Sequence, residues 1–138
     1  MKTIKNQLLG TLQYDEFFWE RKYAFVYEGK TNLVDILIYG EENQTFDEYH
    51  YASFTWLNST FEQSLNESKT ALKKYIATNY NTDECKLTLS AIIIPYKENN
   101  ANSCVGLLFD SPVDEEHGFA AKFLNGRLYS VGSQDIII

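Results

Sequence analysis

The sequence has 138 residues, 44% of them apolar, and it carries 19 Asp and Glu against 12 Lys and Arg, for a formal net charge of −7. A chain of this length can bury its own core, so we expect residues 1–138 to form a single domain. The acidic balance argues against nucleic acid as a partner, because neutralising phosphates requires clustered Lys and Arg.

Cys85 and Cys104 are the only cysteines. We expect both to be buried as small apolar residues, because two cysteines at this spacing form neither a C-x-x-C pair nor a four-ligand metal site. The first residues lack the apolar run of a signal peptide, and an apolar stretch such as 91–94 is too short to span a bilayer. We therefore expect a cytoplasmic protein with no membrane partner and no cofactor, either a monomer or a weak dimer.

The first third of the sequence predicts strands. Within 17–27, aromatic residues such as Trp19, Tyr23 and Phe25 recur at every second position, which is typical of a strand with one covered face. Turn-forming residues at 28–32 separate this strand from the next. Short connections favour an antiparallel meander. The three predicted strands are 7–14, 17–27 and 33–39.

The middle of the sequence predicts two helices. Thr45 and Glu48 have the spacing of a capping box, which indicates a helix start, and helically spaced apolar residues follow. The polar run Asn58-Ser59-Thr60 is expected to end or kink this helix. A second helix is predicted over 61–80.

The last part of the sequence returns to strands. Asn125-Gly126 between two strand-like runs predicts a hairpin, because both turn positions require positive φ. Ile136, Ile137 and Ile138 are expected to lie in the sheet. This order predicts an α+β fold, a largely antiparallel sheet made of an N-terminal meander and C-terminal strands, with a central pair of helices packed on one face. The predicted C-terminal strands are 85–94, 103–109, 119–124 and 127–131.

Acidic residues are unevenly spread along the chain. No Lys or Arg occurs between Lys30 and Lys69 or between Lys97 and Lys122, and these two segments hold seven and five acids. Such segments keep a protein soluble, and they can also form a surface that steers and orients a basic partner. The residues predicted to bind such a partner are Glu41, Glu42, Asp47, Glu48, Glu62 and Glu67.

The densest chemical cluster is Asp114-Glu115-Glu116-His117-Gly118. A carboxylate beside a histidine could act as an acid–base pair, and together with His50 it could form a two-histidine, one-carboxylate metal site. The spacing gives no support for either role, because H-E-x-x-H and related motifs are absent. We favour a structural turn in which Asp114 accepts backbone N–H groups and Gly118 takes a positive φ, and we assign no catalytic residue or metal ligand.

From Asp114 onward the sequence carries a characteristic set of residues: Asp114, Glu116, His117, Gly118, Asn125, Gly126, Gly132 and Asp135. They resemble the C-terminal signature of a family of small uncharacterised bacterial domains, in which a Trp-Asp-x-Glu-His-Gly turn precedes a hairpin that runs to Val-Gly-x-x-Asp. Val113 departs from the pattern, since it stands where the family has Trp. The resemblance implies no enzyme activity, and some relatives resemble immunity proteins of bacterial toxin systems.

Three functional hypotheses follow. The first is a non-enzymatic immunity or inhibitor protein whose acidic surface binds a basic toxin domain, such as a nuclease, and occludes the residues that hold its substrate. The second is a small metal-binding or hydrolytic enzyme that uses the cluster from Asp114 to His117. The third is a structural or regulatory interaction module.

Overall fold

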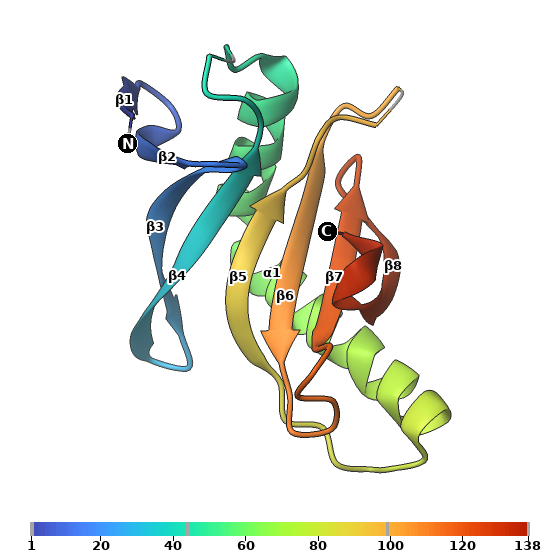
Figure 1. Ribbon diagram of the computed structural model, residues 1–138. Coiled ribbons are helices and arrows are strands. Elements are labelled where there is room, and N and C mark those ends of the chain that lie inside the picture. Colours follow the sequence, from blue (N-terminus) through green and yellow to red (C-terminus); the bar gives the residue numbers. More distant parts are fainter. Residues whose placement is uncertain (1, 44, 99, 138) are drawn as a thin grey trace.

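One eight-stranded sheet and one long helix make up the computed structural model, which describes residues 2–43, 45–98 and 100–137 (Figure 1). The strands lie in the sheet in the order in which they follow along the chain. They are β1 (Thr3–Asn6), β2 (Gly10–Asp15), β3 (Phe18–Tyr27), β4 (Lys30–Tyr39), β5 (Thr88–Ile94), β6 (Cys104–Asp110), β7 (Phe119–Leu124) and β8 (Arg127–Ser133).

The sheet is antiparallel except where β4 and β5 meet. These two strands are parallel, with Ile36 opposite Ile92, because α1 (Glu48–Tyr80) carries the chain back along one face of the sheet between them. The crossover therefore places the start of α1 at the same end of the sheet as the last residues of β4 and β5 (Figure 1). No helix among the described residues combines the length and the apolar character needed to cross a bilayer.

The predicted pair of central helices is wrong, because α1 is one continuous helix of 33 residues. The polar run that was expected to break it satisfies its hydrogen bonds without leaving helical geometry. The hydroxyls of Ser59 and Thr60 both donate to the carbonyl of Trp56, at 3.2 and 2.7 Å. The Asn58 side chain points out of the helix and accepts a hydrogen bond from Tyr23 at 3.0 Å.

The N-cap of α1 lies two residues after Thr45, the predicted N-cap. Asp47 is the N-cap, and its carboxylate accepts a hydrogen bond from the N–H of Tyr49 at 3.1 Å. The reciprocal partner is His50 rather than a glutamate, since its Nδ1 accepts a hydrogen bond from the Asp47 N–H at 3.1 Å. The two residues of the capping box are three positions apart, as expected, but Thr45 is not the N-cap.

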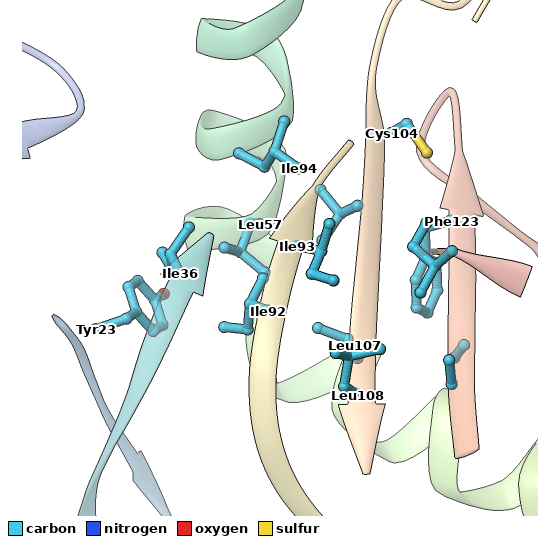
Figure 2. Packing of buried hydrophobic residues seen from close by; sticks show 14 of the residues in the cluster. Tyr23, Ile36, Leu57, Ile92, Ile93, Ile94, Cys104, Leu107, Leu108 and Phe123 are labelled. Carbon is cyan, nitrogen blue, oxygen red and sulfur yellow. The ribbon is translucent and has the colours of Figure 1, made fainter. Parts of the chain in front are cut away.

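The core lies between α1 and the face of the sheet that it covers. Ile36, Ile92 and Leu107 occupy neighbouring strands on that face and are fully buried, as is Leu57 on the helix (Figure 2). Burying side chains of this size contributes about 1.5–3 kcal/mol each. The helix packs across strands β5 to β8.

The opposite face of the sheet is covered near the C-terminus by the short 3₁₀ helix η1 (Gln134–Ile136) and by Ile137. The terminal isoleucines were expected in the sheet, but Ile136 lies in η1 and Ile137 packs across the sheet against Gly106. Ile138 lies outside the described residues. A glycine is needed at position 106 because a Cβ there would overlap the Ile137 side chain.

Several strand boundaries also differ from the prediction. The strand predicted at 7–14 is β2, which starts three residues later and is preceded by the unpredicted strand β1. The turn between β3 and β4 is tighter than expected, because Glu28 and Gly29 alone form it, both with positive φ.

Both cysteines are free thiols. Cys104 is buried as expected, and burial raises its pKa to about 11, whereas Cys85 is only half-buried.

Candidate functional site

Four of the six predicted partner-binding acids lie at one end of the molecule. Glu41 and Glu42 follow β4 directly, Asp47 caps α1, and Glu48 lies in its first turn. All four are exposed. The carboxylates of Asp47 and Glu48 are favourably placed there, because the N-terminus of a helix carries a partial positive charge.

Trp19 on β3 holds this loop in place. Its indole N–H donates to the Glu41 carbonyl at 3.1 Å, and its ring meets that of Phe46 edge-on with a centroid distance of 6.0 Å. The indole is only 1% exposed, so the loop between β4 and α1 is folded over a buried anchor. Glu41 and Asp47 are thereby held at the same end of the sheet.

A fifth acid, Glu16, joins this group from the turn between β2 and β3. The Tyr14 hydroxyl donates to the carbonyls of Glu16 and Gly40, at 2.8 and 3.2 Å, and so ties this turn to the residue before Glu41. We call Glu16, Glu41, Glu42, Asp47 and Glu48 the acidic end.

Exposed aromatic side chains border the acidic end. Phe17 is 68% exposed and Tyr96 is 57% exposed. Tyr39 connects Tyr96 to the sheet, since its ring stacks on Phe18 at 5.9 Å and meets Tyr96 edge-on at 6.0 Å. Aromatic side chains beside charged groups are typical of protein–protein interfaces. Sequence reasoning missed Glu16, Phe17 and Tyr96, because only the turns of the folded sheet bring them next to the loop.

The structure does not bring Glu62 and Glu67 to the acidic end. Glu62 is fourteen positions after Glu48, which corresponds to about 21 Å along a helix. The two residues also lie on opposite flanks of α1: Glu62 lines a groove beside β3, whereas Glu67 lines one beside Phe123 and Leu128. The six acids therefore do not form one surface.

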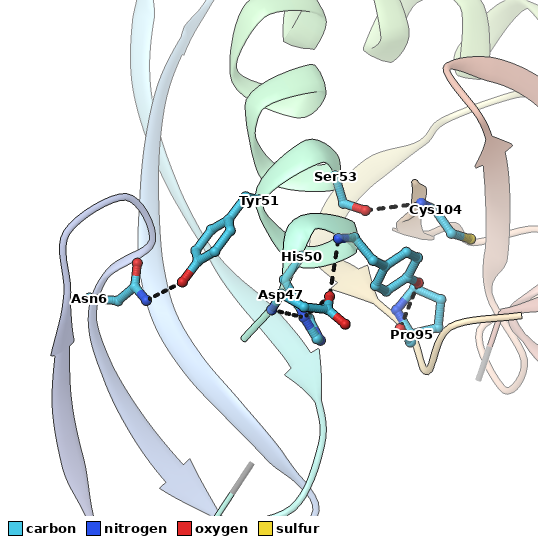
Figure 3. Close-up of polar contacts among 8 residues, drawn as sticks. Asn6, Asp47, His50, Tyr51, Ser53, Pro95 and Cys104 are labelled. Atoms are coloured by element: carbon cyan, nitrogen blue, oxygen red, sulfur yellow. Dashed lines mark hydrogen bonds and ion pairs between the residues drawn. The ribbon is translucent and has the colours of Figure 1, made fainter. Parts of the chain in front are cut away.

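The cap at the start of α1 contains a buried titratable group. His50 is 5% exposed, and burial lowers the pKa of its imidazole, against the opposing effect of Asp47 at 3.0 Å (Figure 3). The neutral ring accepts a hydrogen bond from the Asp47 N–H, so it acts as part of the helix cap.

We expect this cap to weaken as the pH falls. A histidine with a lowered folded-state pKa stabilises the fold fully above its unfolded pKa of about 6.5, and this contribution declines as the pH drops from there through the folded value. Stability measured by urea unfolding between about pH 7.5 and 5.5 should fall in the native chain and fall less in His50→Gln, because glutamine can keep the reciprocal cap without titrating.

His117→Gln is the matched control for this measurement. The hydrogen bond and charge of Asp114 raise the pKa of His117, so its contribution has the opposite sign and is lost as the pH rises. Its removal should therefore make the loss on acidification steeper. An equal pH dependence in His50→Gln and the native chain would contradict the role assigned to His50.

The Asp114–His117 segment forms a turn that is tied to the end of α1. The Tyr80 hydroxyl donates to Asp114 Oδ2 at 2.8 Å, while the N–H and Nδ1 of His117 lie 3.2 and 3.1 Å from Asp114 Oδ1. The Tyr80 hydrogen bond is the main cause that lowers the pKa of Asp114, and the same bond raises the pKa of Tyr80 to about 12. These shifts favour an ionised carboxylate that clamps the helix to the turn.

Several other signature residues shape the turns and the packing of the C-terminal strands. Gly118 has φ +62, and the side-chain oxygen of Asn125 accepts hydrogen bonds from the backbone N–H groups of Asn102 and Ser103, at 2.7 and 3.4 Å. Gly126 completes the hairpin turn with φ +80. Gly132 lies under Ile136, whereas Glu116 and Asp135 are exposed.

The two histidines lie far apart. His50 is in the first turn of α1, and His117 is hydrogen-bonded to the aspartate that binds Tyr80 at its last residue, about 45 Å along the helix axis. A shared two-histidine site is thus ruled out by the length of the helix. Within residues 2–43, 45–98 and 100–137, no group of three or more His, Cys, Asp and Glu is placed to hold a metal ion.

The comparisons with known proteins reach only the C-terminal part. Residues 85–138 match a family model described as a domain of unknown function, DUF6985. This match covers β5 to β8 and η1, and it includes the turn at Asp114 and the Asn125-Gly126 hairpin. No curated protein and no solved structure matches the chain.

Proposed function

We propose that the chain is a non-enzymatic immunity or inhibitor protein, which binds a basic toxin domain at the acidic end and blocks it by occlusion. The observation that carries the proposal is that Glu16, Glu41, Glu42, Asp47 and Glu48 lie at one end of the molecule, on two loops and the first turn of α1, beside one buried anchor. Carboxylates held in this way can pair with the Lys and Arg side chains that a nuclease uses to hold phosphates.

The side chains that border the acidic end favour a protein as the partner. Phe17 and Tyr96 offer apolar area next to charge, which suits an interface in which aromatic side chains are removed from water while the neighbouring charges set orientation. Lys2 is nearby, but its ammonium group donates to the Glu42 backbone carbonyl at 3.4 Å rather than to the carboxylate. The mechanism requires only binding.

The test uses charge reversal with a matched control. The double variant Glu42→Lys/Glu48→Lys changes the acidic end, and Glu67→Lys/Glu115→Lys changes two exposed acids remote from it; each moves the formal net charge from −7 to −3. The probes are the proteins encoded by the two adjacent genes, each measured for growth inhibition, for rescue by the chain and for Kd at low and high salt.

We expect one neighbouring protein to bind, and we expect the first variant to weaken it by about 100-fold and to abolish rescue, because close interfacial charge pairs are strongly coupled. The control should change Kd by less than about threefold, since charges more than a Debye length of roughly 8 Å away are screened. Equal weakening by both variants would exclude the acidic end as the binding surface. Failure of both neighbours to bind would contradict the immunity proposal.

A further inference from the structure

Most of β3 has an open edge. β2 pairs with β3 only over Gln13–Asp15 and Phe18–Glu20, whereas β4 pairs with β3 along its whole length. From Arg21 to Tyr27 the described residues therefore have a strand neighbour on one side only, and Figure 1 shows nothing beside this part of β3. An open edge exposes backbone groups that can pair with another strand.

The tight turn identifies which backbone groups face the open edge. Tyr27 and Lys30 flank the two-residue turn, so they exchange hydrogen bonds with each other. Because inward and outward residues alternate, the N–H and C=O groups of Lys22, Ala24 and Val26 face outward. The Arg21 guanidinium agrees with this assignment: it donates to the Lys22 carbonyl at 2.9 Å and to the Leu9 carbonyl, on the β2 side, at 2.7 Å.

A groove of about 720 Å³ runs along this edge between β3 and the middle of α1. Phe25 and Phe61 lie in it with a ring centroid distance of 4.6 Å. Ser59, Glu62 and Asn66 line its helical wall. The helix is held at this distance from the strand by the hydrogen bonds from Tyr23 to Asn58 and from Tyr27 to Asn66, at 3.0 and 3.1 Å.

We propose that this groove binds an extended segment of a partner protein, which adds to the sheet as a strand beside β3. β2 stops pairing with β3 at Glu20, and the segment would lie beside β3 beyond that point. Its backbone would pair with the backbone of Ala24 and Val26. One face of the added strand would lie against Phe25 and Phe61. A basic side chain on that face would meet Glu62, which is the charged residue that lines the groove.

Charge favours a partner over a second copy of this chain. If the β3 edges of two copies paired antiparallel about a two-fold axis, their helices would lie on the same face of the joined sheet with the two helical walls opposite each other, and the two Glu62 side chains would approach. Like charges in that position oppose association. The inference is independent of the proposed function, because the groove and the acidic end are separate surfaces.

The test selects binders from a displayed library of random peptides of about ten residues, the upper length of an ordinary strand, against the native chain. We expect enriched peptides with alternating apolar residues and at least one Lys or Arg. Ala24→Pro, which removes an outward N–H at a position where an edge strand tolerates proline, should weaken them by about 30-fold. Ala24→Thr keeps that N–H and should change their Kd by less than about threefold.

A second measurement does not depend on how the Ala24→Pro variant folds. Enriched peptides are resynthesised with N-methyl groups on alternate residues, in both phases; one phase should abolish binding to the native chain and the other should preserve it. Failure to enrich any peptide, or binding insensitive to both Ala24→Pro and N-methylation, would overturn the proposal. So would a homodimer, detected by sedimentation, that Ala24→Pro dissociates.

Discussion

Replacing Trp19 with alanine is expected to destabilise the fold by about 3–5 kcal/mol, the usual cost of removing a large buried aromatic side chain. Trp19 is 1% exposed, and its ring packs against Tyr14 at a centroid distance of 5.0 Å and against Phe46 at 6.0 Å. The variant also leaves the Glu41 carbonyl without the indole donor at 3.1 Å. Urea unfolding followed by circular dichroism measures the loss.

Trp19→Phe separates packing from loop anchoring. Phenylalanine keeps an aromatic ring in the core but cannot donate to the Glu41 carbonyl, so most of the stability should remain while the loop between β4 and α1 loosens. Amide hydrogen exchange should then increase at Glu41 and Glu42 and stay unchanged in β6. A loss below about 1 kcal/mol in Trp19→Ala would contradict the assignment of Trp19 as the anchor.

Local sequence patterns predicted strands and turns better than they predicted where a helix is interrupted. The period-two aromatics of β3 and the Asn125-Gly126 hairpin are as expected, because each depends on residues adjacent in sequence. The run Asn58-Ser59-Thr60 misled, since its preference for turns is a property of the isolated segment. In the fold, the Trp56 carbonyl accepts from both hydroxyls and Tyr23 binds Asn58, so tertiary context keeps the helix intact.

The candidate site could be predicted only in part, for a similar reason. Glu41, Glu42, Asp47 and Glu48 are close in sequence and lie at the same end in space. Glu62 and Glu67 share a base-free segment with them, but a straight helix carries them away and turns them to opposite flanks. The open edge of β3 had no local signal, because it depends on where β2 stops pairing with β3.

Ile137→Ala is expected to cost about 2–5 kcal/mol, because this side chain is only 7% exposed and covers the face of the sheet opposite α1. Ile136→Ala is the matched control: that side chain is half-buried, so its truncation should cost less. Urea unfolding of both variants measures the difference. Equal costs would show that burial at position 137 does not hold the C-terminal segment in place.

The close approach of Ile137 to Gly106 allows a double-mutant test of this layer. A Cβ at Gly106 would overlap Ile137 Cγ1 and lie 2.9 Å from Cδ1, so Gly106→Ala alone should cost about 1–3 kcal/mol by overpacking. In Gly106→Ala/Ile137→Ala the clash is gone and the new methyl group fills part of the space left by isoleucine. The combined loss should therefore be smaller than the sum of the single losses by about 0.5–3 kcal/mol, the range for residues in contact. Strict additivity would mean that Ile137 does not pack on Gly106. The requirement for glycine at position 106 would then have another cause.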